Sequence, residues 1–162
     1  DENSKEIVGE SSRAKLTLPR DLTSFYTPSE KYDTIKGEQD KGNIGYTLSR
    51  EDPDRSIYVN ICTDSSDTLE EAIVFHNEHL SKGEEPFTEY TLGEYSGYRS
   101  MSYTNYWNSA NDTTYRYKLN YPVGDKNVIL SCFVKLRDNS DDTTGLEDIL
   151  LAALQQLKVE IK

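Results

Sequence analysis

The chain has 162 residues, 35% of them hydrophobic, which suffices for one domain with its own core. Its net charge is -11 at pH 7, so phosphate backbones repel it and nucleic acid is not expected as a partner. No apolar run is long enough to predict a transmembrane helix.

Residues 1–13 are polar and charged, without a recognisable signal peptide. We expect them to form a flexible tether, followed by a single domain over residues 14–162. The tether, the acidic charge and the even number of cysteines favour a location outside the cytoplasm. The protein would then be secreted or membrane-anchored, with a lipid anchor upstream of Asp1.

Alternating and periodic apolar residues predict the elements in chain order. Strands are expected at residues 14–18, 44–48, 56–62, 87–95, 98–107, 114–121 and 127–136. The last of these is apolar on both faces, so it needs cover on both. Ser96 and Gly97 give the signal of a tight hairpin between two of the strands.

Amphipathic helices are expected at residues 68–82 and 145–157. Each begins with the spacing of a capping box. In the first helix it is Thr68 with Glu71 or Asp67 with Glu70, and in the second it is Thr144 with Glu147. Short turns make neighbouring strands antiparallel. The fold class is therefore α+β, predicted as a three-layer α/β/α sandwich of two main helices and a mostly antiparallel sheet of about six strands.

Several apolar and turn patterns resemble the PsbP-like fold group over about residues 14–162. They are KLTLP (15–19), SIYVNIC (56–62), TLEEAI (68–73), LGEYSGYRSMSY (92–103), NVILSCFV (127–134) and GLEDILLAAL (145–154). That group includes an extrinsic photosystem II subunit, a small Ran-binding nuclear-import factor, and bacterial secreted proteins and lipoproteins. The resemblance implies a three-layer sandwich, usually without enzymatic activity. It implies no common ligand and transfers no functional residue.

Cys62 and Cys132 lie in the two most apolar predicted strands. If those strands are neighbours, a disulfide is geometrically allowed, and two buried free thiols are the equal alternative. A catalytic cysteine needs exposure and a nearby base, which these positions do not suggest.

His76 and His79 are the only histidines, and their spacing puts them on one face of the first helix. Two ligands are too few for a metal, and HNEH is not the HExxH motif. We expect His76 to pack within the apolar stripe. A hydrolase-like site around His76 and His79 would need a cleft that also holds a carboxylate or a cysteine. We therefore predict neither an enzyme nor a cofactor.

The acidic loop before the second helix contains Asp138, Asp141 and Asp142. Clustered carboxylates suit calcium, but the loop lacks the glycine that an EF-hand has at its sixth position. Helix capping and favourable interaction with the helix dipole explain the same residues. We predict no metal site and keep these residues, with the two histidines, as weak candidates.

The aromatic strands offer candidate ligand-binding residues, Tyr98, Tyr103, Tyr106 and Trp107. Core packing is the alternative, because a half-wet sheet face accommodates tyrosine well. The sequence favours a non-enzymatic extracytoplasmic binding or assembly module, whose partner is an unknown protein or glycan at the cell surface. The alternative is a carbohydrate- or peptide-binding surface domain that uses exposed aromatic rows.

Overall fold

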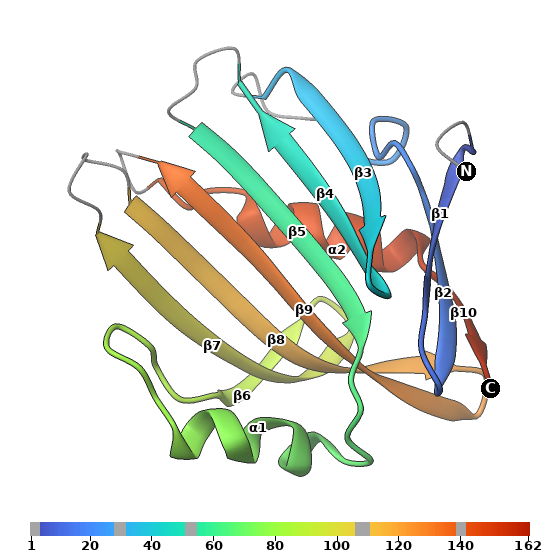
Figure 1. Ribbon diagram of the computed structural model, residues 1–162, viewed down its shortest axis with the longest axis vertical. Helices are drawn as coiled ribbons and strands as arrows, with labels where there is room; N and C mark the ends of the chain where they lie inside the picture. Colours follow the sequence, from blue (N-terminus) through green and yellow to red (C-terminus); the bar gives the residue numbers. More distant parts are fainter. Residues whose placement is uncertain (1–3, 28–31, 51–54, 106–110, 139–141) are drawn as a thin grey trace.

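The computed structural model describes residues 4–27, 32–50, 55–105, 111–138 and 142–162. Its strands are β1 (Glu6–Glu10), β2 (Ala14–Pro19), β3 (Thr34–Asp40), β4 (Asn43–Ser49), β5 (Arg55–Thr63), β6 (Thr88–Leu92), β7 (Tyr95–Asn105), β8 (Asn111–Val123), β9 (Lys126–Asp138) and β10 (Lys158–Ile161). Its helices are α1 (Leu69–Glu78) and α2 (Leu146–Gln156). Figure 1 shows their arrangement.

Seven antiparallel strands form the main sheet in the order β3-β4-β5-β9-β8-β7-β6, and a second sheet has the order β1-β2-β10. The α+β class and the two helices are confirmed. The main sheet has seven strands, not the six predicted, because residues 34–40 pair with β4 as an additional edge strand.

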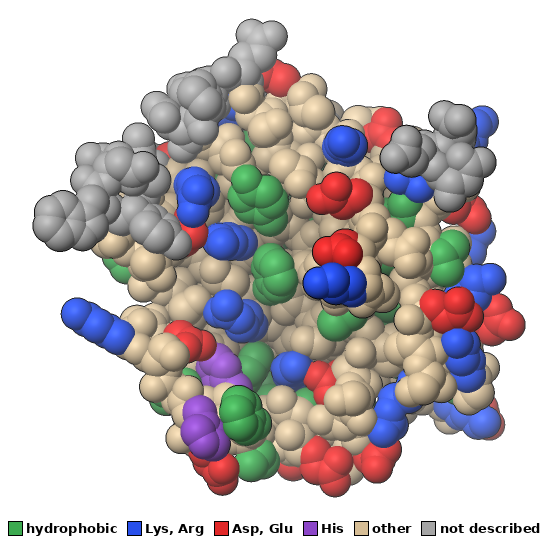
Figure 2. Space-filling view, in the orientation of Figure 1, with side chains coloured by type: hydrophobic (Ala, Val, Ile, Leu, Met, Phe, Trp, Pro, Cys, Tyr) green, Lys and Arg blue, Asp and Glu red, His purple; other side chains and the backbone are tan. Residues whose placement is uncertain are grey.

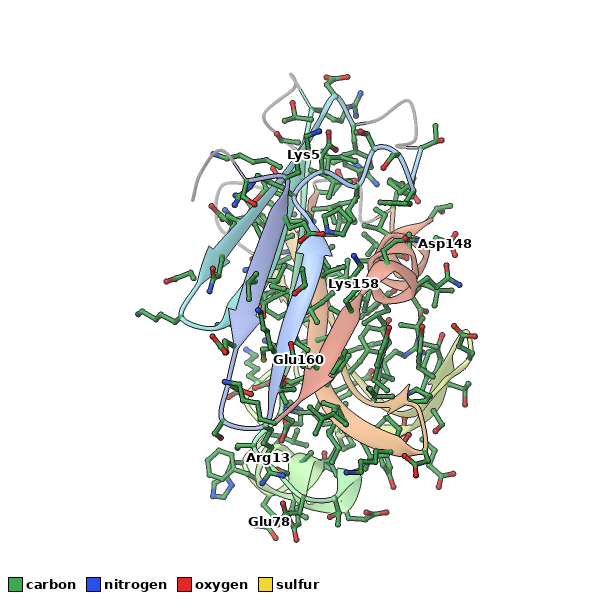
Figure 3. The ribbon with its side chains drawn as sticks, turned by 90° about the vertical axis from the view of Figure 1, so that its right-hand side faces the viewer. Lys5, Arg13, Glu78, Asp148, Lys158 and Glu160 are labelled. Atoms are coloured by element: carbon green, nitrogen blue, oxygen red, sulfur yellow. The ribbon has the colours of Figure 1, made fainter. Side chains whose placement is uncertain are left out.

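The hydrophobic core lies between one face of the main sheet and α2 (Figure 1). The predicted apolar stripe of α2 is confirmed, since Leu146, Ile149, Leu150, Ala153 and Leu154 are buried. The small sheet closes the same core from the side. In Figure 3 its three strands lie side by side, and β10 follows directly from the end of α2. One helix and one small sheet therefore cover a single face of the main sheet.

The other face of the main sheet is only partly covered. No residue of α1 is buried, and Phe75 is 74% exposed. With ten residues α1 is about 15 Å long, and its main strand contacts are with β7 and β8. The predicted burial of both faces of β9 is therefore wrong: Leu130 and Val134 are buried, but Ile129 and Phe133 remain partly exposed.

The N-terminal segment is not a tether over the residues that the structure describes. Glu6–Glu10 pairs with β2 as β1, and Ile7 is buried. Gly9 allows this approach, because a Cβ there would lie 2.6 Å from the carbonyl oxygen of Gly42 in the β3–β4 turn. The domain thus includes residues assigned to the tether.

The helix ends match the sequence at one position and differ at two. Thr68 caps α1 as predicted, its Oγ1 accepting a hydrogen bond from the Glu71 amide at 3.2 Å. However, α1 ends at Glu78, short of residue 82. The cap of α2 is Gly145 in the left-handed region, without a side-chain hydrogen bond, so the second capping box is wrong.

The β6–β7 hairpin turns earlier than predicted. Gly93 has a φ of +58° and sits in the turn, whereas Ser96 and Gly97 lie inside β7. A Cβ on Gly97 would lie 2.0 Å from the Lys118 carbonyl oxygen. Gly97 is therefore needed for the close approach of β7 to β8. A glycine in this role resembles the glycine of a turn in the sequence.

A buried ion pair joins the ends of β5 and β9 on the core side. Arg55 and Asp138 are 4% and 6% exposed, pair directly across the two strands, and form a salt bridge. Arg55 also donates from Nε to the Tyr32 hydroxyl at 2.6 Å and from NH2 to the Asp142 carbonyl oxygen at 2.8 Å. Asp138 is thus a partner of arginine, which removes it as a metal candidate.

Replacing Asp138 should leave the Arg55 guanidinium buried without its anion. We expect Asp138→Asn to lower the free energy of unfolding by about 3–5 kcal/mol, measured by urea denaturation. Glu6→Gln is the control, because Glu6 and Lys158 form an exposed pair at 3.6 Å that should contribute below about 1 kcal/mol. Equal losses in the two variants would contradict this role for the buried pair.

Candidate functional site: the open face of the main sheet

The face of the main sheet that points away from α2 is the candidate site, called the open face below. Strand alternation sends there the side chains Tyr58, Asn60, Arg116, Lys118, Phe133, Lys135 and Arg137. The buried neighbours of these residues along each strand face α2 instead. Figure 2 shows Lys and Arg side chains gathered on this face beside hydrophobic ones.

The register of β5, β9 and β8 sets these side chains in rows. Arg116 lies opposite Phe133, which lies opposite Asn60. In the next row Lys135 lies opposite Tyr58. Side chains directly opposite one another on a sheet face lie within contact distance. Cationic and aromatic groups therefore alternate over the centre of the face.

Two carboxylates hold the cations in place. Asp112 is buried and accepts from Arg137 at 2.9 and 3.2 Å, with Lys135 Nζ at 3.4 Å. Asp64 accepts from Lys118 Nζ at 2.6 Å. On β8 and β9 the open face thus carries four cations and one carboxylate, within a chain of net charge -11. The face is locally positive and its charges are pre-organised.

Asp64 is ionised by its surroundings. Burial favours the neutral acid, but hydrogen bonds from Lys118 and Ser66 outweigh it and hold the pKa of Asp64 below its usual value. Lys118 also donates to the Ser131 hydroxyl at 2.9 Å, which fixes the ammonium over the face.

A pocket of about 270 Å³ lies where α1 meets the open face. Its lining includes Phe75, His76 and Phe87 on one side and Arg116 and Phe133 on the sheet. Aromatic side chains with one cation are a common lining for a binding pocket. The pocket extends the open face under α1.

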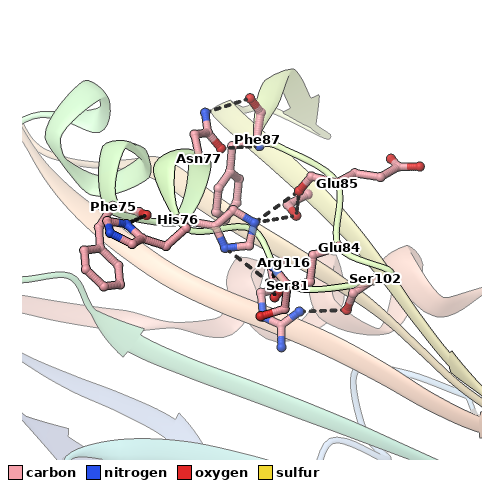
Figure 4. A network of polar contacts seen from close by, with 11 residues as sticks. Phe75, His76, Asn77, Ser81, Glu84, Glu85, Phe87, Ser102 and Arg116 are labelled. Atoms are coloured by element: carbon pink, nitrogen blue, oxygen red, sulfur yellow. Dashed lines mark hydrogen bonds and ion pairs between the residues drawn. The ribbon is translucent and has the colours of Figure 1, made fainter.

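His76 fastens α1 to the sheet through the network in Figure 4. Its Nε2 lies 3.1 Å from both the Glu85 carbonyl oxygen and Ser100 Oγ, and its Nδ1 lies 3.7 Å from Glu84 Oε2. Its ring meets Phe87 edge-on at 4.7 Å between centroids. Hydrogen bonding at Ser81, followed by the nearby His76 and Arg116, holds the pKa of Glu84 below its usual value.

In this network the histidine contacts a serine through one ring nitrogen and a carboxylate through the other. These are the three groups of a hydrolytic triad. Ser100, however, is 1% exposed and donates its hydroxyl proton to the Glu85 carbonyl oxygen at 2.6 Å. A nucleophilic serine must present Oγ to a substrate and give its proton to the histidine. The geometry favours a packed histidine, as the sequence predicts, over a hydrolytic site.

The two histidines do not converge on a metal. His79 stacks on Phe75 with ring centroids 4.4 Å apart, and its Nδ1 lies 3.0 Å from the Phe75 carbonyl oxygen. In the part of the chain that the structure describes, no three His, Cys, Asp or Glu side chains are grouped for a metal ion. Asp142 caps Thr144 through its Oδ1, and Asp141 lies outside the described residues.

The two candidate aromatic residues that the structure describes lie on opposite faces of the main sheet. Tyr98 and Tyr103 differ in strand parity on β7, so they point to opposite faces. Tyr103 is 44% exposed, while Tyr98 is only partly exposed. Tyr106 and Trp107 lie outside the described residues. Strand alternation in the sequence predicts this opposite placement, and a ligand-binding role for the four residues stays a prediction.

Cys62 and Cys132 lie on neighbouring strands, but as free thiols. Cys132 pairs with Ile61, and Cys62 with Ser131, so the two side chains point to opposite faces. Burial raises the pKa of both thiols. The free-thiol alternative is the one that the structure contains.

The cations of the open face are the functional candidates that sequence reasoning missed. The alternation of Arg116 with Tyr117 and of Lys135 with Val134 marks a polar face on each strand. The tight turn around Gly124 sets the two strands in register. A strand predicted to be buried on both faces has no exposed face for these cations, so the alternation alone does not predict a site there.

Protonating Asp64 should remove its attraction to Lys118. The pKa of Asp64 is lower in the folded state than its unfolded value of about 3.9. The attraction to Lys118 therefore stabilises the fold fully above that unfolded value, and this stabilisation is lost as the pH falls through the folded-state pKa. We expect Asp64→Asn to lower the melting temperature at pH 7, with a difference from wild type that shrinks below about pH 4. Melting curves across this range would test it. Asp125→Asn, at an exposed turn, is the control; a pH-independent difference for Asp64→Asn would contradict the prediction.

No protein-family model and no curated protein sequence matches this chain. Among solved structures, LpqN of Mycobacterium tuberculosis, involved in cell envelope biogenesis, is 15% identical with a TM-score of 0.49, over 95% of this chain and 90% of LpqN. The Saccharomyces cerevisiae Ran-binding protein Mog1p is 15% identical with a TM-score of 0.46, over 98% of this chain and 96% of Mog1p. A mutant of Mog1 is 14% identical with a TM-score of 0.45, over 96% of this chain and 95% of that chain. With TM-scores below 0.5 these likenesses carry no argument here, and PsbP-like membership stays a prediction.

Proposed function

We propose that this chain is a non-enzymatic binding module that holds an acidic segment of a partner protein on the open face of its main sheet. The observation that carries the proposal is the cluster of Arg116, Lys118, Lys135 and Arg137 on two adjacent strands of an acidic chain. The net negative charge of the chain opposes an acidic partner, so a local cluster of cations is what would attract and orient one.

The chemistry of the face supports a protein partner. Arginine and tyrosine are enriched where binding energy concentrates in protein interfaces, and Tyr58 is 38% exposed at the centre of the face. Phe133 lies one row away from Tyr58 and offers an apolar contact between the cations. A segment that alternates carboxylate and apolar side chains matches this pattern, because an extended chain presents alternate residues to the same side.

The buried carboxylates make the face suitable for binding. Asp112 and Asp64 hold Arg137 and Lys118 in defined positions, so less side-chain freedom is lost when a partner docks. Arg116 donates from Nη1 to the Ser102 hydroxyl at 2.8 Å, a neutral partner, and the nearby Glu84 carboxylate offsets part of its charge. Because its hydrogen-bond partner is neutral, Arg116 keeps more of its charge for an incoming carboxylate than Lys118 or Arg137 does.

A location outside the cytoplasm remains part of the proposal. It rests on the acidic charge of the chain. The free thiols and the folded β1 remove the other two observations that favoured it. None of the helices in the described part of the chain is long and apolar enough to cross a membrane. Fractionation of cells that express the native gene would test the location.

Neutralising the open face should weaken acidic-peptide binding. We expect a short fluorescent peptide of alternating glutamate and phenylalanine to bind the wild type, with an affinity that falls as salt rises. The double variant Arg116→Gln and Lys135→Gln should bind it about tenfold more weakly, equivalent to about 1.4 kcal/mol. Fluorescence anisotropy measures both affinities.

The control makes the same change of charge on the small sheet. Lys15→Gln with Lys158→Gln removes two cations from β2 and β10, where Lys158 is labelled in Figure 3. This variant should keep the wild-type affinity to within about twofold. An equal loss in both double variants would show that only net charge matters, and no binding by the wild type would refute the proposal outright.

A further inference from the structure

A second site lies on the α2 side of the main sheet, beyond the start of α2. Two cavities of about 260 and 220 Å³ meet there and share Tyr115 and Thr143 in their linings. We call them together the tyrosine groove, lined by Met101, Tyr103, Tyr115, Thr143, Glu147 and Asp148. Together they reach the size range of ligand pockets, which begins at about 300 Å³.

The wall of the groove is held by backbone hydrogen bonds. The segment after α1 runs along β7, where Tyr103 N donates to the Gly83 carbonyl oxygen at 3.1 Å and Glu85 N donates to that of Met101 at 2.8 Å. Gly83 has a φ of +85°, and a Cβ there would lie 2.5 Å from the Tyr103 carbonyl oxygen. This packing fixes Tyr103 at the rim, with its side chain 44% exposed.

A polar cluster forms the inner end of the groove. The Glu147 carboxylate accepts from the Tyr90 hydroxyl at 2.8 and 2.7 Å and from Arg99 NH1 at 2.9 Å. The Arg99 guanidinium lies 3.9 Å from the ring centroid of Tyr90 and 5.5 Å from that of Tyr115. Glu147 keeps about a quarter of its side chain exposed, at 27%, so it can accept further hydrogen bonds.

One hydroxyl beside this cluster lacks a partner. Tyr117 Oη is the buried side-chain polar atom that finds no hydrogen bond among the described residues. Burial raises the pKa of Tyr117 and the neighbouring Glu147 carboxylate raises it further. Tyr117 is fully buried and lines neither cavity of the groove, so its hydroxyl is part of the polar surroundings of Glu147 and not a contact offered to a ligand.

We propose that the tyrosine groove binds a pyranose ring of a neutral glycan. A pyranose has a face of C–H groups that packs on a tyrosine ring, and hydroxyls that donate to carboxylates. Tyr103 and Tyr115 supply the rings, and Glu147 and Thr143 supply hydrogen-bonding groups. Glu85, Glu147 and Asp148 make the groove acidic, which selects against anionic sugars.

This site is independent of the proposed function. The tyrosine groove uses odd-numbered residues of β7 and β8, whereas the open face uses even-numbered residues of β8. The two sites therefore lie on opposite faces of the main sheet, and either can fail without the other.

The test is a titration of the whole chain with maltotetraose, cellotetraose and chitotetraose, in which isothermal titration calorimetry measures the affinity for each sugar. We expect at least one to bind, and Tyr103→Ala to weaken that sugar about tenfold because the stacking ring is lost. Tyr103→Phe keeps the ring and should stay within about twofold of wild type. It also separates loss of stacking from loss of folding, which melting temperatures monitor for each variant.

Tyr58→Ala is the matched control, since Tyr58 is similarly exposed but lies on the open face. It should leave sugar affinity unchanged. A hyaluronan tetrasaccharide serves as the anionic probe and should not bind. Three results would each overturn the proposal: no binding of any neutral sugar, an unchanged affinity in Tyr103→Ala, or tighter binding of the anionic probe than of the neutral ones.

Discussion

The burial of one face of the main sheet against α2 is the constraint on which the rest of the structure depends. Five apolar side chains of α2 cover the alternate residues of β5, β8 and β9 that point toward them. Burial of this kind supplies most of the stabilisation of a domain. On the opposite face α1 covers only one end of the sheet, so the side chains there are polar or half-exposed. That asymmetry leaves one face of the main sheet solvated. The open face exists because α1 is short and lies at one end of the sheet.

Charge follows the same asymmetry. On the core side, Arg55 and Asp138 are buried together, and each needs the other because an unpaired charge is costly there. On the open side, Asp112 is equally buried, but its partners Lys135 and Arg137 extend to the surface. A buried anion with exposed cations positions those cations without consuming all of their charge. The same strand end thus carries a closed ion pair on one side and an open cluster on the other.

The sequence allows the α+β class, the α2 stripe and the Thr68 cap to be predicted, because each depends on residues close together in the chain. The errors arise where distant contacts decide. Leu69 and Ile73 follow helical periodicity, yet α1 buries neither, since periodicity gives an apolar stripe and not the extent of its cover. Gly97 predicts a turn, but it lies inside β7, where the close approach of β8 leaves no room for a Cβ. For the candidate sites, the parity of Tyr98 and Tyr103 is visible in the sequence, whereas which face is open depends on where α1 docks.

Strand β8 shows how one element can serve two surfaces. Tyr115 and Tyr117 point to the α2 side, and Arg116 and Lys118, between and after them, point to the open face. A period of two residues separates the two sets completely, so substitutions at even positions address one face and those at odd positions the other. The backbone that carries both is held on each side, by β7 and β9, in a ladder that spans most of its length. Side chains on such a central strand keep their positions when one face is occupied. The sheet can therefore present a cationic surface and an aromatic groove back to back, with the acidic remainder of the chain keeping other anionic molecules away.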